Sequence, residues 1–191
     1  YAEQDKNALA GLIAAYSNRL RELPLYIDDR TIYIEDMLYA WRSHLVRHPD
    51  TKWIGIDYFQ QMQTRERFRN RLDGYNHILA QLKAFRMNTG IPMILLSQLN
   101  RMEWREDDGP ELHHLKDCGT LEQDAHVVML LSALDPAKVE VDGQFAFPMQ
   151  VNIAKQKDGP CKRVVLRFVK PQFLFMSRHR GRDDLPKQTE M

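Results

Sequence analysis

The chain has 191 residues, 43% of them hydrophobic and 28% charged, which excludes a mainly disordered protein and predicts one globular core. Because 27 basic side chains face 26 acidic ones, the net charge of +1 attracts neither nucleic acid nor a membrane surface, and any anion site must be a local cluster. Two cysteines allow one disulfide at most, and neither a signal peptide nor a membrane-spanning run is found, so we expect a cytoplasmic protein.

Two amphipathic helices are predicted in the first part of the chain. In each, apolar residues recur three or four positions apart, and the stripes stop near Pro24 and Pro49. The first stripe comprises Leu9, Leu12, Ile13, Tyr16 and Leu20, and the second comprises Ile34, Met37, Leu38, Trp41 and Leu45.

Two apolar runs predict parallel strands that are buried on both faces. Residues 53–57 end in Asp57, and residues 91–96 are followed by Ser97 and Gln98. In an open α/β sheet, ligands bind beyond the carboxyl ends of the strands, so Asp57 and Gln98 are candidate site residues.

A third helix is predicted between these runs, with an apolar stripe from Phe68 to Phe85 and Gly90 as its C-terminal cap. Residues 126–131 form another apolar run, which predicts a third buried strand. The order of strand, helix, strand, loop and strand favours an α/β fold.

The last third of the chain alternates apolar and polar residues over 149–154 and again over 164–168. This period of two predicts an antiparallel hairpin, with its turn at Asp158 and Gly159. Residues 177–191 are predicted to be a polar, frayed tail.

Asp57 and Gln98 each allow two interpretations. A carboxylate at the end of a buried strand suits magnesium in a nucleotide hydrolase, but it also suits a cap of a nearby helix or turn. Gln98 could bind a terminal phosphate or a neighbouring loop. The residues alone leave these alternatives open.

Basic residues later in the chain also allow two interpretations. The charged interval over residues 100–117 is either a solvated loop or a contact with a nucleic-acid backbone. Lys155 and Lys157 are two positions apart on a predicted strand and are expected on one face. They could enter a phosphate site of another subunit or only protect a sheet edge from aggregation.

No phosphate-binding loop is present in the sequence. A P-loop requires G-x-x-x-x-G-K-[ST], and none of the nine glycines is followed by lysine. The chain also starts at Tyr1 and not at methionine, so we expect it to be a fragment of a longer protein.

Four ordered segments resemble the C-terminal motor domain of DnaB-type replicative helicases. They are residues 53–62 (WIGIDYFQQM), 91–101 (IPMILLSQLNR), 115–131 (LKDCGTLEQDAHVVMLL) and 153–160 (IAKQKDGP). The resemblance extends over residues 23–175. It implies a RecA-like fold with a mostly parallel sheet flanked by helices and a C-terminal antiparallel hairpin, truncated on its N-terminal side. Residues 1–176 would be a partial ATPase domain.

The resemblance implies roles at an ATP site. Asp57 matches the aspartate that supports Mg²⁺ through water, and Gln98 matches the glutamine that couples the γ-phosphate to the DNA-binding loops. Lys155 and Lys157 match the basic pair that reaches into the neighbouring subunit's ATP site, where a cation stabilises transition-state charge.

The resemblance also implies DNA contacts. Lys116, Asp117 and Gly119 match loop residues that hold the DNA backbone. Arg101, which closes the motif that contains the sensing glutamine, is a further expected DNA contact. The family forms hexameric rings that translocate on single-stranded DNA, and primase and a helicase loader are the further partners implied, in a bacterial or phage-infected cell.

Several positions depart from the family pattern. Lys157 stands where arginine is usual and lacks the planar fork of a guanidinium group. Lys116, Asp117 and Cys118 stand where Arg-Glu-Ser is common, and His126 replaces an aspartate. The P-loop and the catalytic glutamate should lie upstream of Tyr1.

The sequence therefore predicts a fragment of an ATP-dependent DNA helicase that is inactive as an ATPase in isolation. One alternative is a degenerate RecA-like module that binds DNA or docks onto a helicase without hydrolysing ATP. Another is a recombination-type or clock-type RecA-fold ATPase, which the LKDCGTLEQDA segment disfavours.

Overall fold

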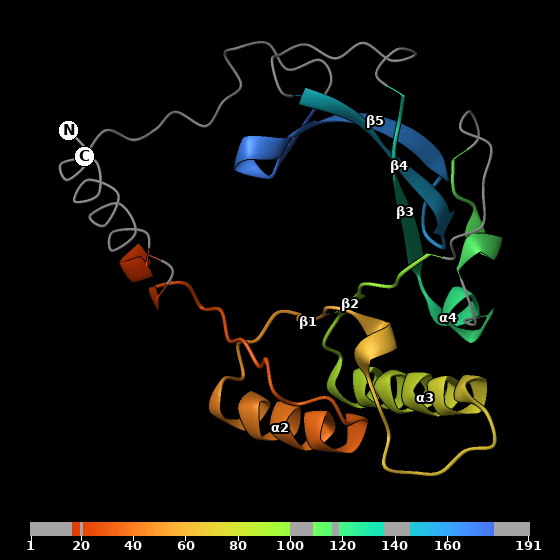
Figure 1. Ribbon diagram of the computed structural model, residues 1–191. Coiled ribbons are helices and arrows are strands. Elements are labelled where there is room, and N and C mark those ends of the chain that lie inside the picture. Colours follow the sequence, from red (N-terminus) through yellow and green to blue (C-terminus); the bar gives the residue numbers. More distant parts are fainter. Residues whose placement is uncertain (1–16, 20, 100–108, 116–118, 136–145, 178–191) are drawn as a thin grey trace, which may run out of the picture. The chain divides into compact units, whose positions relative to one another are not determined.

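A computed structural model describes residues 17–19, 21–99, 109–115, 119–135 and 146–177 (Figure 1). The chain divides into two compact units, Tyr1–Ile32 and Tyr33–Met191. In the first unit, residues 17–19 and 21 are helical, and all five residues of the first predicted stripe lie outside the described residues. The extended segment after Pro24 agrees with the predicted end of that helix.

The second unit begins with α2 (Ile34–Arg47), as the apolar stripe predicts. The two predicted parallel strands are β1 (Ile54–Ile56) and β2 (Met93–Leu95), which pair in parallel with Ile54 opposite Met93. Between them lie the 3₁₀ helix η1 (Phe59–Gln61) and the helix α3 (Arg71–Thr89). Gly90 ends α3 in the left-handed conformation with φ 72°, which confirms the predicted cap.

The core lies between one face of the parallel pair and the helices α2 and α3, which Figure 1 shows on the same side of β1 and β2. Its buried side chains come from α2, β1, α3 and the turn around η1: Ile34, Leu38, Ile56, Phe59, Met62, Tyr75, Ile78, Leu79, Leu82 and Phe85. Phe85 packs edge-on against Trp41 of α2, with ring centroids 5.5 Å apart. This packing holds the end of β1 on a rigid support.

The prediction that both strands are buried on two faces is wrong for the described part of the chain. Trp53, Ile94 and Leu96 are 52%, 54% and 50% exposed, and they alternate with covered neighbours. Helices cover a parallel sheet, and α2 and α3 cover only one face of this pair. On the open face, the Trp53 ring lies over Gly55, where a Cβ would come within 2.8 Å of the indole.

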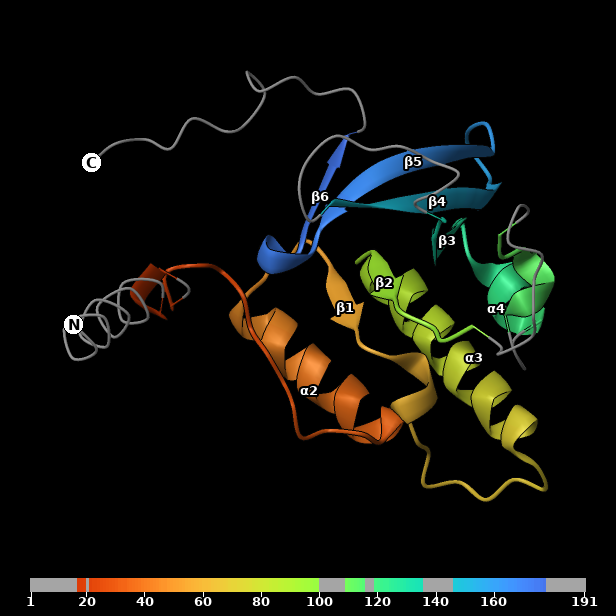
Figure 2. The same cartoon turned by 45° about the horizontal axis from the view of Figure 1, so that its top comes forward.

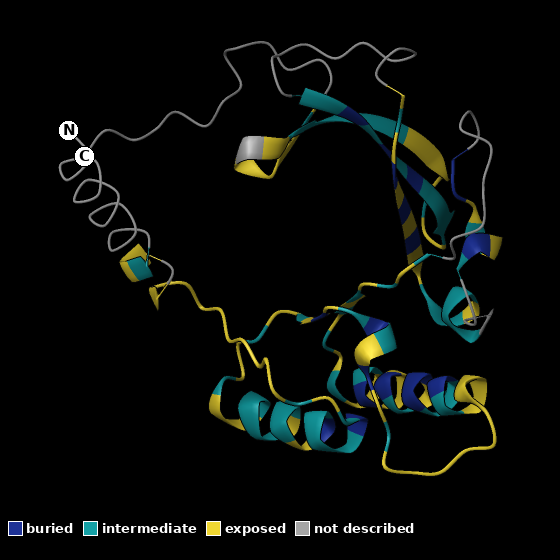
Figure 3. Ribbon diagram, viewed as in Figure 1, coloured by how far each residue is buried: buried dark blue, intermediate teal, exposed yellow. Residues whose placement is uncertain are grey.

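A second sheet contains β3 (Val127–Ala133), β4 (Ala146–Gln156), β5 (Lys162–Val169) and β6 (Leu174–Ser177), in that order. All three neighbouring pairs are antiparallel. The run over residues 126–131 therefore joins the hairpin and not the parallel pair. Figure 3 shows buried and exposed residues alternating along β3, so this strand is not buried on both faces.

The predicted hairpin is present as β4 and β5, but its turn is longer than two residues. Residues 157–161 connect the strands, and Gly159 does not adopt the positive φ that a tight Asp-Gly turn requires. Ser177, predicted as the first residue of the tail, is the last residue of β6, and residues 178–191 lie outside the described residues.

Three short elements complete the unit: η2 (Leu112–His114), α4 (Gly119–Asp124) and η3 (Lys170–Gln172). Figure 2 shows α4 beside α3, and two polar contacts join these helices. Lys83 Nζ lies 2.6 Å from Asp124 Oδ1, and Thr120 Oγ1 donates to Asn76 Oδ1 at 2.8 Å. None of the described helices has the length and hydropathy needed to cross a membrane.

Candidate functional site

Asp57 follows β1 directly at its carboxyl end, as the sequence predicts. Its side chain is exposed, whereas Ile56 before it is buried and Phe59 after it is fully covered. The Asp57–Tyr58 peptide bond is cis. The apolar neighbours fix the backbone, so the carboxylate projects into solvent from a rigid strand end.

Gln98 lies beyond the carboxyl end of the adjacent strand, so the parallel pairing brings both predicted residues to one edge of the sheet. Its backbone is held by the side chain of Gln60. The Gln98 N–H donates to Gln60 Oε1 at 3.1 Å, and Gln60 Nε2 donates to the Gln98 carbonyl oxygen at 3.3 Å. Gln60 Nε2 also lies 3.0 Å from Ser97 Oγ.

Gln60 is a site residue that the sequence reasoning missed. Its own carbonyl oxygen faces α3, where it accepts from Arg71 Nη2 and from the Tyr75 hydroxyl, each at 3.5 Å. The only sequence signal is an amide side chain three positions after Asp57. That position has no helical or strand periodicity to mark it.

The loop between η1 and α3 is tied to the start of α2 by Glu35. Glu35 Oε1 accepts from Thr64 Oγ1 at 2.6 Å and from the Arg65 N–H at 3.1 Å. Burial raises the pKa of Glu35, but the hydrogen bonds from Thr64 and from backbone N–H groups outweigh it, so its pKa lies below the ordinary 4.5. Asp36 beside Arg65 raises the pKa of that guanidinium group through a hydrogen bond.

Lys155 and Lys157 are not equivalent in the structure. Lys155 lies in β4, and its ammonium donates to the carbonyl oxygens of Glu122 and Gln123, the latter at 2.9 Å. These carbonyls are at the C-terminal end of α4, where a cation is favourable. β4 ends at Gln156, so of the two lysines only Lys155 lies within the strand.

Lys157 is exposed in the connection between β4 and β5. Its backbone N–H donates to the His126 carbonyl oxygen at 3.0 Å, which closes the end of the β3–β4 pair. Within the described part of the chain, no hydrogen bond or ion pair involves the Lys157 ammonium group. This cation is available to another molecule, whereas that of Lys155 is engaged within its own chain.

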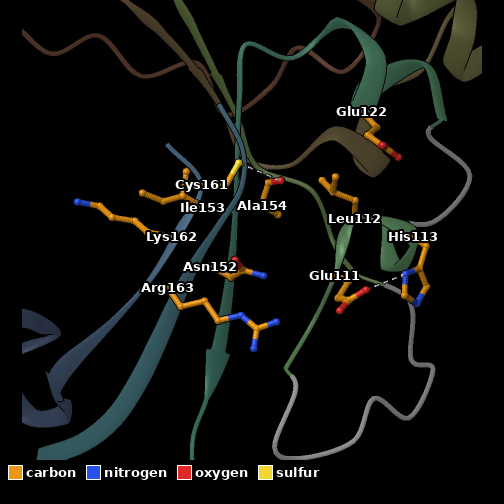
Figure 4. Close-up of a pocket in the computed structure, with 10 residues that line it drawn as sticks. All are labelled: Glu111, Leu112, His113, Glu122, Asn152, Ile153, Ala154, Cys161, Lys162 and Arg163. Atoms are coloured by element: carbon orange, nitrogen blue, oxygen red, sulfur yellow. Dashed lines mark hydrogen bonds and ion pairs between the residues drawn. The ribbon is translucent and has the colours of Figure 1, made fainter. Parts of the chain in front are cut away.

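A hollow of about 550 Å³ lies beside this hairpin (Figure 4). Asn152 and Arg163 extend from the sheet toward Glu111, which also lies 3.6 Å from His113 Nδ1. The lining carries both signs of charge: Glu111, Leu112, His113, Glu122, Asn152, Ile153, Ala154, Cys161, Lys162 and Arg163. Because acidic and basic side chains are mixed in its lining, this hollow lacks the uniformly positive charge expected of a phosphate-binding site.

The predicted DNA-binding residues are placed only in part. Gly119 is the first residue of α4. Arg101, Lys116 and Asp117 lie outside the described residues. Residues 109–115 are anchored by a bridge between Leu99 and Leu115.

Few side chains at the carboxyl ends of the described parallel strands could act as metal ligands. Among the residues that the structure describes, no group of three or more His, Cys, Asp or Glu side chains could hold a metal ion. Mg²⁺ with a bound nucleotide needs only one or two carboxylates, because phosphates and waters complete its shell. Asp57 fits this requirement, with the amide of Gln98 at the same edge.

The chain is similar to known replicative helicases. The family model "DnaB-like helicase C terminal domain" matches residues 3–177. The replicative DNA helicase DnaB of Leifsonia xyli is 35% identical over 82% of this chain and 34% of its own length. The replicative DNA helicase DnaC of Bacillus subtilis is 32% identical over 95% of this chain and 39% of its own. The chain thus spans little more than a third of these relatives.

Solved structures agree in fold. One of them, described as an ATPase domain, superposes with a TM-score of 0.64 at 28% identity, covering 76% of this chain and 51% of that one. A second structure, described as a DnaB-like replicative helicase and its interactions with primase, superposes with a TM-score of 0.67 at 29% identity. The match covers 79% of this chain and 37% of that one. The predicted α/β, RecA-like fold class is confirmed, and the chain belongs to the DnaB-like helicase C-terminal domain family.

Proposed function

We propose that the chain is the later part of an ATP-dependent motor that translocates on single-stranded DNA and unwinds duplex DNA during replication. The observation that carries this proposal is the joint position of Asp57 and Gln98 at the carboxyl edge of the parallel pair, braced by Gln60. In α/β folds this edge is where ligands bind. Membership of the helicase family supports the nucleotide as that ligand.

In this proposal Asp57 supports Mg²⁺ of a bound ATP through water, and Gln98 faces the terminal phosphate. Mg²⁺ would neutralise charge on the phosphates when it is bound. In this proposal the P-loop comes from residues upstream of this chain. The relatives, of which the chain covers 34% and 39%, are longer than this chain. We therefore expect the isolated chain to hydrolyse no ATP.

Lys157 is the proposed trans-acting cation, because its ammonium group is exposed at the end of the hairpin. Lys155 would act mainly by holding α4, whose first residue is Gly119. Arg101, Lys116 and Asp117 are proposed to contact the DNA backbone together with Gly119. A cation supplied in trans requires a neighbouring subunit, and the family resemblance makes a hexameric ring the proposed assembly. Primase and a helicase loader are proposed partners.

ATP hydrolysis with and without single-stranded DNA tests the proposal in the isolated chain and in the full natural gene product. We expect DNA-stimulated turnover only in the longer protein. Asp57→Asn should abolish that turnover, whereas Asp29→Asn, which changes an exposed aspartate that lies 3.7 Å from Arg30, should leave it unchanged. Absence of hydrolysis in both proteins would favour the non-hydrolysing module, and full turnover of Asp57→Asn would remove Asp57 from the site.

Salt dependence tests the DNA contacts separately. Binding to single-stranded DNA should weaken steeply as salt rises, because contacts with phosphates release counterions. Lys157→Ala should reduce turnover when it is mixed into rings with unmodified subunits. Unchanged turnover in a ring made only of this variant would exclude the trans role of Lys157.

A further inference from the structure

We propose that Gln60 is a positioning residue that holds the backbone of Gln98 in place and couples it to the start of α3. The inference rests on the proposed function, in which Gln98 faces the terminal phosphate of ATP. It adds a residue that acts through the backbone of Gln98. Its basis is the set of hydrogen bonds around Gln60, which joins three separate elements of the chain.

The backbone ladder between the two parallel strands stops before it reaches Gln98. The Leu96 N–H donates to the Ile56 carbonyl oxygen at 3.0 Å, and the Phe59 N–H donates to the Leu96 carbonyl oxygen at 2.8 Å. After Phe59 the chain turns into η1, whose backbone groups bond within the turn. The backbone that follows β1 therefore cannot pair with Gln98.

The Gln60 side chain takes the place of the missing strand backbone. Its amide oxygen accepts from the Gln98 N–H, and its amide nitrogen donates to the Gln98 carbonyl oxygen. A primary amide presents the same acceptor and donor as a peptide group, and no other type of neutral side chain does so with this geometry. Because the backbone of Gln98 is held in this way, its exposed side chain remains free to bind a ligand.

The opposite side of Gln60 contacts α3. Its carbonyl oxygen accepts from Arg71 and from the Tyr75 hydroxyl, and the Arg71 guanidinium carbon lies 5.0 Å from the centre of the Tyr75 ring. Tyr75 is 5% exposed and packs against Phe59, which is fully buried, with ring centroids 4.9 Å apart. A displacement of the Gln98 backbone would therefore move η1 and the first turns of α3 together.

Hydrogen exchange of the Gln98 amide in the natural gene product tests the clamp directly. Gln60→Met keeps a side chain of similar length but removes the acceptor and the donor. We expect the Gln98 amide to exchange about tenfold faster, the effect of losing one hydrogen bond of ordinary strength. The Leu96 amide, bonded to the Ile56 carbonyl oxygen, should not change.

The matched control is Gln61→Met. Gln61 is the next residue of η1 and is exposed, and its side-chain amide donates to the Tyr58 hydroxyl at 2.8 Å. It should leave exchange of the Gln98 amide unchanged. Gln60→Glu keeps an acceptor for the Gln98 N–H but loses the donor, so its exchange rate should lie between those of the wild type and Gln60→Met. If Gln60→Met unfolds, faster exchange of the Gln98 amide in Gln60→Glu than in Gln61→Met still identifies the clamp.

Steady-state ATP hydrolysis by the same variants tests the link to function. A misplaced sensing group should lower DNA-stimulated kcat by on the order of tenfold to a hundredfold, with KM for ATP nearly unchanged. Gln60→Glu should recover part of that loss, and Gln61→Met should show none. A general loss of stability would instead reduce the active fraction and would also accelerate exchange at Leu96.

The outcomes separate the two proposals. If Gln98 exchanges as slowly in Gln60→Met as in the wild type, the clamp is overturned. If exchange accelerates but kcat matches that of Gln61→Met, the positioning role is overturned. If the natural protein hydrolyses no ATP, the proposed function fails, and faster exchange in Gln60→Met would still support the clamp while refuting its coupling to hydrolysis.

Discussion

Replacing Lys155 with methionine should loosen the segment around α4, whereas Lys157→Met should not. The Lys155 ammonium donates to two carbonyl oxygens in the last turn of α4. Methionine keeps most of the aliphatic stem and removes the charge and the donors. Because α4 has six residues, its stability depends on such tertiary contacts more than on its own helix propensity.

The magnitude follows from these two hydrogen bonds. Hydrogen bonds to charged groups contribute about 1.5–3 kcal/mol each, but Lys155 is only partly buried, so water replaces part of the interaction. We therefore expect Lys155→Met to cost about 1–2 kcal/mol of local stability, which corresponds to a factor of about 5–30 in the opening equilibrium. Contacts of α4 with Lys83 and Asn76 remain and limit the loss.

The assay is hydrogen exchange at the Ala125 amide, which donates to the Leu121 carbonyl oxygen at 3.0 Å across α4. Exchange should accelerate about 5–30-fold in Lys155→Met. Lys157→Met is the control, since its ammonium group is exposed. Equal exchange at Ala125 in Lys155→Met and the wild type would refute the capping role, and equal acceleration in both variants would show a general charge effect.

Four other substitutions probe the support of the site. Phe85→Ala should lower the free energy of unfolding by about 3–5 kcal/mol in urea titration, because the ring is 1% exposed and packs on Trp41; a loss below about 1 kcal/mol would contradict a rigid core there. Gly90→Ala should lower the free energy of unfolding by about 1–2 kcal/mol because of the φ of 72° alone, since an added Cβ would meet no atom within 4 Å. Gly74→Ala, within α3, should raise the free energy of unfolding by about 0.5–1 kcal/mol. A change of the same sign in both variants would contradict this explanation. Because the pKa of Glu35 is lowered in the folded state, its contribution to folding stability is fully present above the ordinary pKa of 4.5 and is lost as pH falls through the folded pKa. The difference in unfolding free energy between the wild type and Glu35→Gln should therefore shrink on acidification. A difference that stays constant from about pH 7 to about pH 3 would refute this.

The helices and the cap were predictable because their signals are local. The stripe from Ile34 to Leu45 and the glycine at position 90 report side-chain periodicity and backbone preference within a few residues. The strand ends at Asp57 and Gln98 were predictable for the same reason, and their common edge followed from the parallel pairing of β1 with β2. The ordered motifs also indicated the family before any contact was known.

The incorrect predictions concern how many faces of each strand are covered by other elements. Residues 126–131 are apolar enough for a strand covered on two sides, yet β3 pairs antiparallel with β4, and one of its faces is exposed. The runs at 53–57 and 91–96 likewise have an open face. Hydrophobicity measures the tendency of a segment to be covered, but it does not identify the element that covers it.

The amino-acid sequence was sufficient for the order of the elements, the candidate residues Asp57 and Gln98, and the family to which the chain belongs. Only the tertiary structure assigned Gln60 to the backbone of Gln98 and Lys155 to the end of α4. These partners are 38 and 32 positions apart in the chain. Such contacts depend on how strands and helices pack. Because packing brings together groups that are far apart in the chain, the spacing of residues within a short segment does not predict them.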